Sequence, residues 1–131
     1  MLSYVMVGAN DLPRSDRFYS VILMPLGYEK KESADALVFS LPDIPDRDNG
    51  PGTVYVTRPY DGREATVGNG SMIAFQAQTH ALVCTIHAAG LEAGGSDEGV
   101  SPVKRWRPGT WRRCSDASRR RSSRRGRNWP P

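Results

Sequence analysis

Near its N-terminus the chain reads YVMVGANDLP over residues 4–13, and this stretch decides the first half of the fold. Residues 4–7 form a short apolar run that is typical of a buried strand. Asn10 or Asp11 is suited to begin a helix, because its side-chain oxygen can accept an unpaired backbone N–H. Pro13 falls in the first turn, where a missing N–H costs nothing. We therefore predict a strand at 2–8 and a helix at 12–23.

The following residues predict three more strands. The segment 28–32 is short and polar, 36–41 is the most apolar, and 53–58 alternates and is rich in β-branched and aromatic residues. The proline- and glycine-rich segment 42–52 is a loop. The order predicted so far is β-α-β-β-β.

The pattern then starts again after a polar linker. Residues 71–77 predict a strand, and Thr79 is placed to cap a helix at 79–93, which ends at two glycines, 94 and 95. A second copy of the first unit would need three more strands, and residues 100–131 show no alternation that would supply them. The predicted division is a first module at 1–60, the start of a second at 61–99, and a tail at 100–131.

Charge separates the tail from the rest of the chain. Residues 1–99 carry seven basic and thirteen acidic side chains, a net charge of −6, whereas residues 100–131 carry eleven basic side chains against Asp116, a net charge of +10. Two interpretations are open: a basic extension that binds nucleic acid through phosphate contacts, or an out-of-frame reading of a GC-rich gene, which yields Arg, Pro, Gly, Ser and Trp. Because the tail is so rich in positive charge, we expect it to be irregular or disordered, with only weak affinity for nucleic acid.

Three stretches resemble the vicinal oxygen chelate superfamily, which includes glyoxalase I, bleomycin-resistance proteins and extradiol dioxygenases. Residues 7–12 (VGANDL) followed by 17–19 (RFY) resemble its first strand and helix, residues 70–75 (GSMIAF) the opening of its second module, and residues 88–95 (AAGLEAGG) the end of that helix. The resemblance covers roughly residues 2–98. It implies an α+β fold of paired βαβββ modules, forming a half-barrel sheet with outer helices, in which this chain's second module is truncated or aberrant.

The resemblance also locates the family's metal ligands. Metal-using members take a His from the first strand, a His or its equivalent from the start of the second module, and a Glu from the last strand. The first two positions fall at Tyr4 and Met72, and the tail replaces the region of the third. A phenol and a thioether are poor ligands for a hard divalent cation. We therefore predict a relative with no metal ligands and no cofactor.

The residues expected to bind a ligand are Tyr4, Arg58, Tyr60 and Met72, and no catalytic residue can be assigned. Arg58 follows a predicted strand, where its guanidinium either clamps an anionic ligand or pairs with Asp61. The predicted function is binding of a small organic ligand by a glyoxalase/bleomycin-resistance-like protein without a metal. The alternatives are a metal-dependent lyase, similar to lactoylglutathione lyase, or an extradiol-type dioxygenase, and nucleic-acid binding through the tail.

Partners and location are predicted from what the chain lacks. A single half-barrel leaves sheet edges open, so we expect a homodimer that pairs modules across subunits. No apolar run is long enough to cross a bilayer, and residues 1–4 show no basic region followed by an apolar stretch, so no signal peptide is expected. We therefore expect a cytoplasmic protein with no membrane partner.

Overall fold

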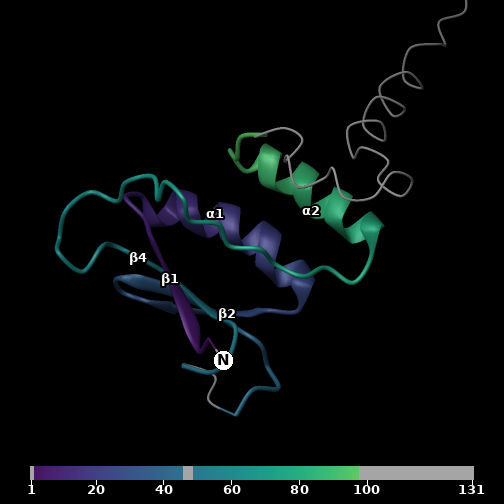
Figure 1. Cartoon of the computed structure of the whole chain (residues 1–131), viewed down its shortest axis with the longest axis horizontal. Helices are drawn as coiled ribbons and strands as arrows, with labels where there is room; N and C mark the ends of the chain where they lie inside the picture. Colours follow the sequence, from purple (N-terminus) through teal and green to yellow (C-terminus); the bar gives the residue numbers. More distant parts are fainter. Residues whose placement is uncertain (1, 46–48, 98–131) are drawn as a thin grey trace, which may run out of the picture. The chain divides into compact units, whose positions relative to one another are not determined.

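A computed structural model describes residues 2–45 and 49–97 of the chain. In these residues four strands, two α-helices and one short 3-10 helix follow each other in the order that Figure 1 shows. They are β1 (Tyr4–Gly8), α1 (Leu12–Leu23), η1 (Met24–Leu26), β2 (Glu29–Ser33), β3 (Ala36–Ser40), β4 (Thr53–Thr57) and α2 (His80–Glu92). The strands expected at 2–8, 28–32, 36–41 and 53–58 and the helices expected at 12–23 and 79–93 are therefore confirmed, with shifts of one or two residues at their ends.

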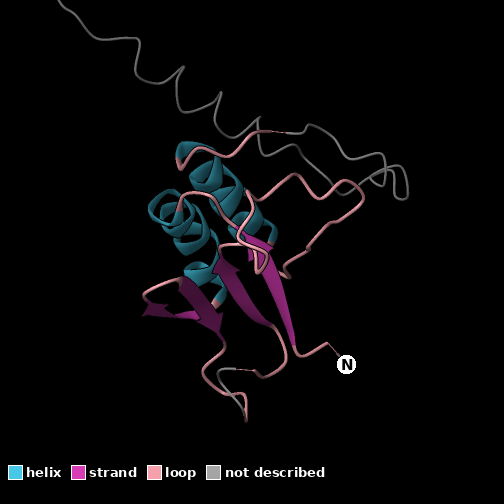
Figure 2. Ribbon diagram, turned by 90° about the vertical axis from the view of Figure 1, so that its left-hand side faces the viewer, coloured by secondary structure: helices cyan, strands magenta, loops and turns pink. Residues whose placement is uncertain are grey.

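The four strands form one mixed sheet in the order β1-β4-β3-β2. β1 lies parallel to β4, and Tyr4 is opposite Thr53 at the start of that pair. β4 and β3, and β3 and β2, are antiparallel. Figure 2 shows the helices gathered on one side of this sheet. Strand, helix and three strands make one complete βαβββ unit, which confirms the α+β fold class.

Local interactions explain where α1 begins and ends. The Asp11 side chain accepts a hydrogen bond from the backbone N–H of Arg14 at 2.9 Å, and Pro13 lies in the first turn. The sequence predicts that the helix stops before Pro25, but the chain continues through Pro25 as the short helix η1. This helix ends at Gly27, whose φ of 92° favours glycine. The chain thereby turns directly into β2.

The core lies between the sheet and α1. Its buried residues are Ala9, Leu23, Leu37, Phe39, Val54 and Val56, and half-buried side chains of β1, α1 and the following turn pack around them. Along β1 and β4 every second residue points into this core, as the two-residue period of a strand requires. The opposite face of the sheet therefore carries Tyr4, Met6 and Tyr55, and we call it the open face.

The strand predicted at 71–77 is wrong. These residues form no ladder, and only Phe75 packs against the core, with its ring edge-on to that of Tyr28. Alternation predicts which side chains share a face but supplies no neighbouring strand, and no strand of the described residues pairs with this segment. An isolated strand leaves its backbone groups without partners in the protein, so the segment stays irregular.

The chain divides into two units, Met1–Gly95 and Ser96–Pro131. Nearly all of the second unit, and with it every prediction made for the tail, lies outside the described residues. The division of the first unit into a module at 1–60 and the start of another at 61–99 stays a prediction. Among the described residues, no helix is both long enough and apolar enough to span a membrane.

Candidate functional site

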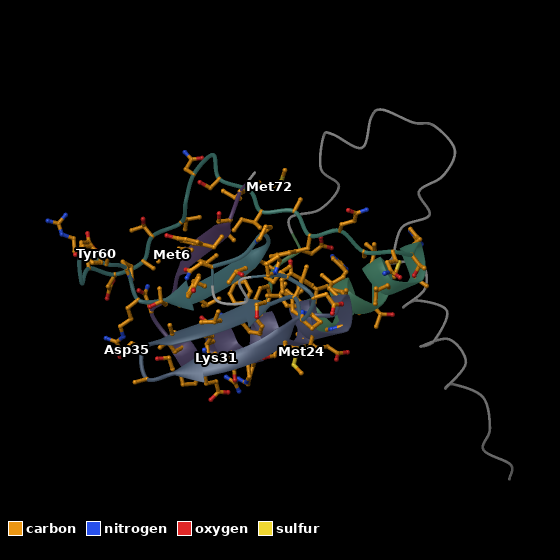
Figure 3. The ribbon with its side chains drawn as sticks, turned by 90° about the horizontal axis from the view of Figure 1, so that it is seen from below. Met6, Met24, Lys31, Asp35, Tyr60 and Met72 are labelled. Carbon is orange, nitrogen blue, oxygen red and sulfur yellow. The ribbon has the colours of Figure 1, made fainter. Side chains whose placement is uncertain are left out.

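The open face presents a mixed row of side chains across the middle of the sheet. The register places Met6, Tyr55, Val38 and Lys31 side by side on β1, β4, β3 and β2. Figure 3 views the molecule from the side of the sheet, with Met6 on β1 and Lys31 on β2 labelled. Met6 is 56% exposed, which is unusual for a thioether in the middle of a strand. Val38 is buried in this row, so Met6 is the row's exposed apolar side chain, on the face that lies opposite the core.

A hollow of about 360 Å³ lies at the end of the open face where β1 and β4 both end, and we call it the open-face hollow. Its walls come from β1 and from the loop that follows β4. The lining residues are Met6, Gly8, Arg58, Pro59, Asp61, Glu64, Ala65 and Thr66. Its volume lies in the range of small-ligand pockets, and its wall combines apolar and charged groups.

The loop over this hollow is fastened to the first module. The Asn10 side-chain amide donates to the carbonyl of Ala65 at 3.0 Å, and its oxygen accepts from the N–H of Ala65 at 2.6 Å. Gly8 permits this approach, because a Cβ built there would lie 3.0 Å from the Ala65 Cβ. Two hydrogen bonds and a glycine contact therefore fix the loop on the end of β1.

Arg58 lines this hollow and a second one. Of the two roles expected for it, pairing with Asp61 is not what the structure shows: Asp61 instead accepts from the backbone N–H of Arg63 at 3.1 Å and lies 3.8 Å from its Nε. Within the described residues, no hydrogen bond or ion pair engages the Arg58 guanidinium. Arg58 is exposed and lines both hollows, and its role in binding an anionic ligand stays a prediction.

The second hollow, about 670 Å³, lies between the start of α1 and the β2–β3 turn, and we call it the α1-side hollow. Its lining residues are Asn10, Asp11, Leu12, Pro13, Asp16, Glu32, Ser33, Ala34, Leu37 and Arg58. Lys30 donates to Asp16 at 3.0 Å and lies 2.6 Å from the Glu32 carboxylate, so it balances both acids. Burial acts to raise the pKa of Asp16, but the hydrogen bonds from Lys30 and Ser20 outweigh it and leave that pKa below its ordinary value.

The four residues predicted to bind ligand differ in their relation to these two hollows, and their roles stay predictions. Arg58 lines both hollows, whereas Tyr4, Tyr60 and Met72 line neither. The Tyr4 ring packs edge-on against Tyr55 with ring centroids 5.4 Å apart, at the other end of β1 from the open-face hollow. Figure 3 places Tyr60 and Met72 on the long loop after β4, where both are largely exposed.

The sequence reasoning missed Met6, Gly8, Asn10 and Glu64. Alternation along β1 was enough to place Met6 on the same face as Tyr4. Nothing in one sequence, however, indicates that Asn10 bonds to Ala65, which is 55 residues away. The close approach of Gly8 to Ala65 depends on that same contact and could not be predicted from the sequence either.

The described residues do not fit the metal that the resemblance would imply. No three His, Cys, Asp or Glu side chains among residues 2–45 and 49–97 lie close enough to hold an ion. At the two expected ligand positions the donors are a tyrosine phenol and a methionine thioether, which hard divalent cations bind poorly. We therefore derive no step through a metal.

Comparison with known proteins gives an informative match among the solved structures. The chain is similar to the crystal structure of a glyoxalase/bleomycin resistance protein from Albidiferax ferrireducens T118, with 36% sequence identity and a TM-score of 0.66. The match covers 78% of this chain and 77% of that one. No protein-family model and no curated protein matches the sequence.

Proposed function

Because the chain belongs to the glyoxalase/bleomycin resistance family of the vicinal oxygen chelate superfamily, we propose that it binds a small organic ligand on the open face, without a metal ion. The observation that carries this proposal is Arg58, which lines the open-face hollow and whose guanidinium has no hydrogen-bond or ion-pair partner within the described residues. An arginine in such a position can hold a carboxylate or phosphate with two parallel hydrogen bonds. Met6 beside it supplies apolar contact.

The metal-free form of the proposal rests on donor chemistry. With a phenol at position 4 and a thioether at position 72, the chain has no imidazole at the two positions where the resemblance places metal ligands. Metal-dependent lyase or dioxygenase chemistry needs such an ion, which a phenol and a thioether would hold poorly. Sequestration of the ligand is therefore favoured over its turnover.

A thermal-shift screen tests the binding proposal. Purified full-length protein is melted with thiol conjugates, catechols and glycopeptide antibiotics over a range of concentrations. A ligand at one hundred times its Kd stabilises the folded state by about 2.7 kcal/mol, so a hit raises the melting temperature in a saturable way. Arg58→Gln should weaken that shift, whereas Arg17→Gln, an exposed arginine on α1 that lines neither hollow, should leave it unchanged. If Arg58→Gln leaves the thermal shift of a ligand unchanged, that ligand binds at a site that does not include Arg58.

Metal analysis separates this proposal from the enzymatic alternative. We expect elemental analysis of the dialysed protein to find no stoichiometric Ni, Zn, Fe or Mn. A ratio near one metal ion per chain would overturn the metal-free proposal and favour the metal-dependent lyase or dioxygenase.

A homodimer completes the proposal. The sheet is open, and β1 and β2 are its edge strands, so neither outer edge has a neighbour among the described residues. Unpaired edges favour association with a second copy. Sedimentation at micromolar concentration should therefore give twice the mass of 14.5 kDa; a compact monomer would contradict it.

The basic tail is proposed to be dispensable for ligand binding, in a protein that we expect to be cytoplasmic. A chain truncated after Gly99 should bind the screen's hits as well as the full chain does. Tight, sequence-selective and steeply salt-dependent nucleic-acid binding that is lost on truncation would instead establish the tail as functional.

A further inference from the structure

Two opposite charges line the open-face hollow without meeting each other. Arg58 stands at the end of β4, and Glu64 stands further along the loop. The third charged group of the lining, Asp61, is engaged by Arg63. Within the described residues, neither the Arg58 guanidinium nor the Glu64 carboxylate takes part in a hydrogen bond or an ion pair. The hollow thus presents one unbalanced cation and one unbalanced anion.

The remaining wall between these charges is apolar or small. It is formed by Met6, Gly8, Pro59 and Ala65, together with Thr66. A complementary ligand therefore carries an anionic and a cationic group on a compact body with an apolar portion. We propose that the open-face hollow recognises an amino-acid-like zwitterion, its carboxylate on Arg58 and its ammonium on Glu64. This inference rests on the proposed function and names the ligand class of the same site.

Charge complementarity favours a zwitterion over either simpler ion. A ligand with only a carboxylate can contact Arg58 but brings its negative charge near Glu64. A ligand with only an ammonium can contact Glu64 but brings its positive charge near Arg58. Like charges brought into one hollow repel each other and oppose binding. A ligand with both groups satisfies both side chains and adds no net charge to the hollow.

The loop that carries Glu64 is already in place before binding. Its next residue, Ala65, is held by two hydrogen bonds from Asn10, and Gly8 allows the close contact. A preformed loop reduces the conformational entropy that a ligand must offset.

The test uses three probes that differ only in their charged groups: phenylalanine, 3-phenylpropionate, which lacks the ammonium, and 2-phenylethylamine, which lacks the carboxylate. Each is titrated into the full-length protein by NMR at constant, low ionic strength and pH 7. We expect phenylalanine to bind with a Kd on the order of tenfold lower than that of either analogue, as charge-assisted contacts on a partly exposed site warrant.

Paired variants assign the two contacts. Arg58→Gln should abolish the advantage of phenylalanine over 2-phenylethylamine, and Glu64→Gln should abolish its advantage over 3-phenylpropionate. Arg17→Gln and Glu92→Gln are matched controls on the exposed surfaces of α1 and α2 and should leave all three Kd values unchanged. The wild-type probe series needs no variant, so it stays decisive even if one substitution disturbs folding.

Three results would overturn the inference. They are equal binding of phenylalanine and one analogue, no measurable binding of phenylalanine, and retention of both preferences in the two variants. If phenylalanine fails while a compound from the thermal-shift screen binds and needs Arg58, the zwitterion inference falls and the proposed function stands. If no organic compound of either set binds, both fall together.

Discussion

The first module and the segment that follows it contain similar proportions of apolar residues but bury them very differently. In β3, four of five residues are buried, whereas in α2, a helix built largely of apolar residues, only Gly90 is buried. β3 lies between two strands and under α1, but α2 packs against α1 alone among the helices and strands with substantial contacts. Apolar composition therefore does not create a core by itself; a facing surface does.

The largest expected difference between the two regions concerns phenylalanine packing. Phe39 on β3 is fully buried, whereas Phe75 is half-buried beside Tyr28. Phe39→Ala should lower the free energy of unfolding by about 3–5 kcal/mol, because it leaves a cavity in the core. Phe75→Ala should lower it by about 1–2 kcal/mol, since less area and one aromatic contact are lost. Urea denaturation measures both, and equal losses would show that segment 71–77 is as tightly packed as the sheet.

The second prediction concerns the link that fastens the loop to β1. Asn10→Ala removes both hydrogen bonds to Ala65, each with a net value of about 0.5–1.5 kcal/mol. We expect the loss to appear as local opening, with faster hydrogen exchange at the Ala65 amide and a smaller change in global stability. Asn69→Ala, in the same loop and without a side-chain hydrogen bond among the described residues, is the control. Unchanged exchange at Ala65 would mean that the loop is held by other contacts.

The two helix caps provide a matched comparison of the regions. Asp11 accepts from the N–H of Arg14 at 2.9 Å, and Thr79 accepts from the N–H of Leu82 at 3.1 Å. Replacing either by Ala should cost about 1 kcal/mol of helix stability. Asp11→Ala should shift the urea midpoint of the whole first unit, because α1 covers the core. Thr79→Ala should chiefly increase hydrogen exchange in the first turn of α2, and equal global shifts would contradict the difference in burial.

The success of prediction from the sequence also differs between the first module and the segment that follows it. β1, α1 and the strands of the first module carry local signals: alternation, a cap at Asp11 and Pro13 in the first turn. The helix after Thr79 was predictable for the same reason. The strand at 71–77 was not, because its alternation gives no information about a partner strand.

The candidate site was predictable only in part. Arg58 was recognised because a cation directly after a strand end is a local feature. The contact of Asn10 with Ala65, and the place of Glu64 in the same hollow lining as Arg58, depend on how the loop folds back, which no local pattern contains. Met72 was named from the resemblance and Tyr60 from its place just after a strand end, and neither residue lines either hollow.

The smallest expected effect distinguishes two ion pairs by their pH dependence. The pKa of Asp16 is lowered, because the hydrogen bonds from Lys30 and Ser20 outweigh the burial that acts to raise it. A carboxyl whose folded-state pKa lies below its ordinary value of 3.8 stabilises the fold above that value, and the contribution is lost as the pH falls through the lowered pKa. Asp16→Asn should therefore lower the free energy of unfolding by about 0.2–1 kcal/mol at neutral pH, and the difference from the unaltered protein should vanish as the pH falls below the lowered pKa of Asp16. The exposed pair of Asp61 and Arg63, at 3.8 Å, lies in the second region, and Asp61→Asn should have no measurable effect at either pH. Urea denaturation at several pH values checks both variants; a pH-independent loss for Asp16→Asn would show that its hydrogen bonds, rather than its charge, join α1 to β2.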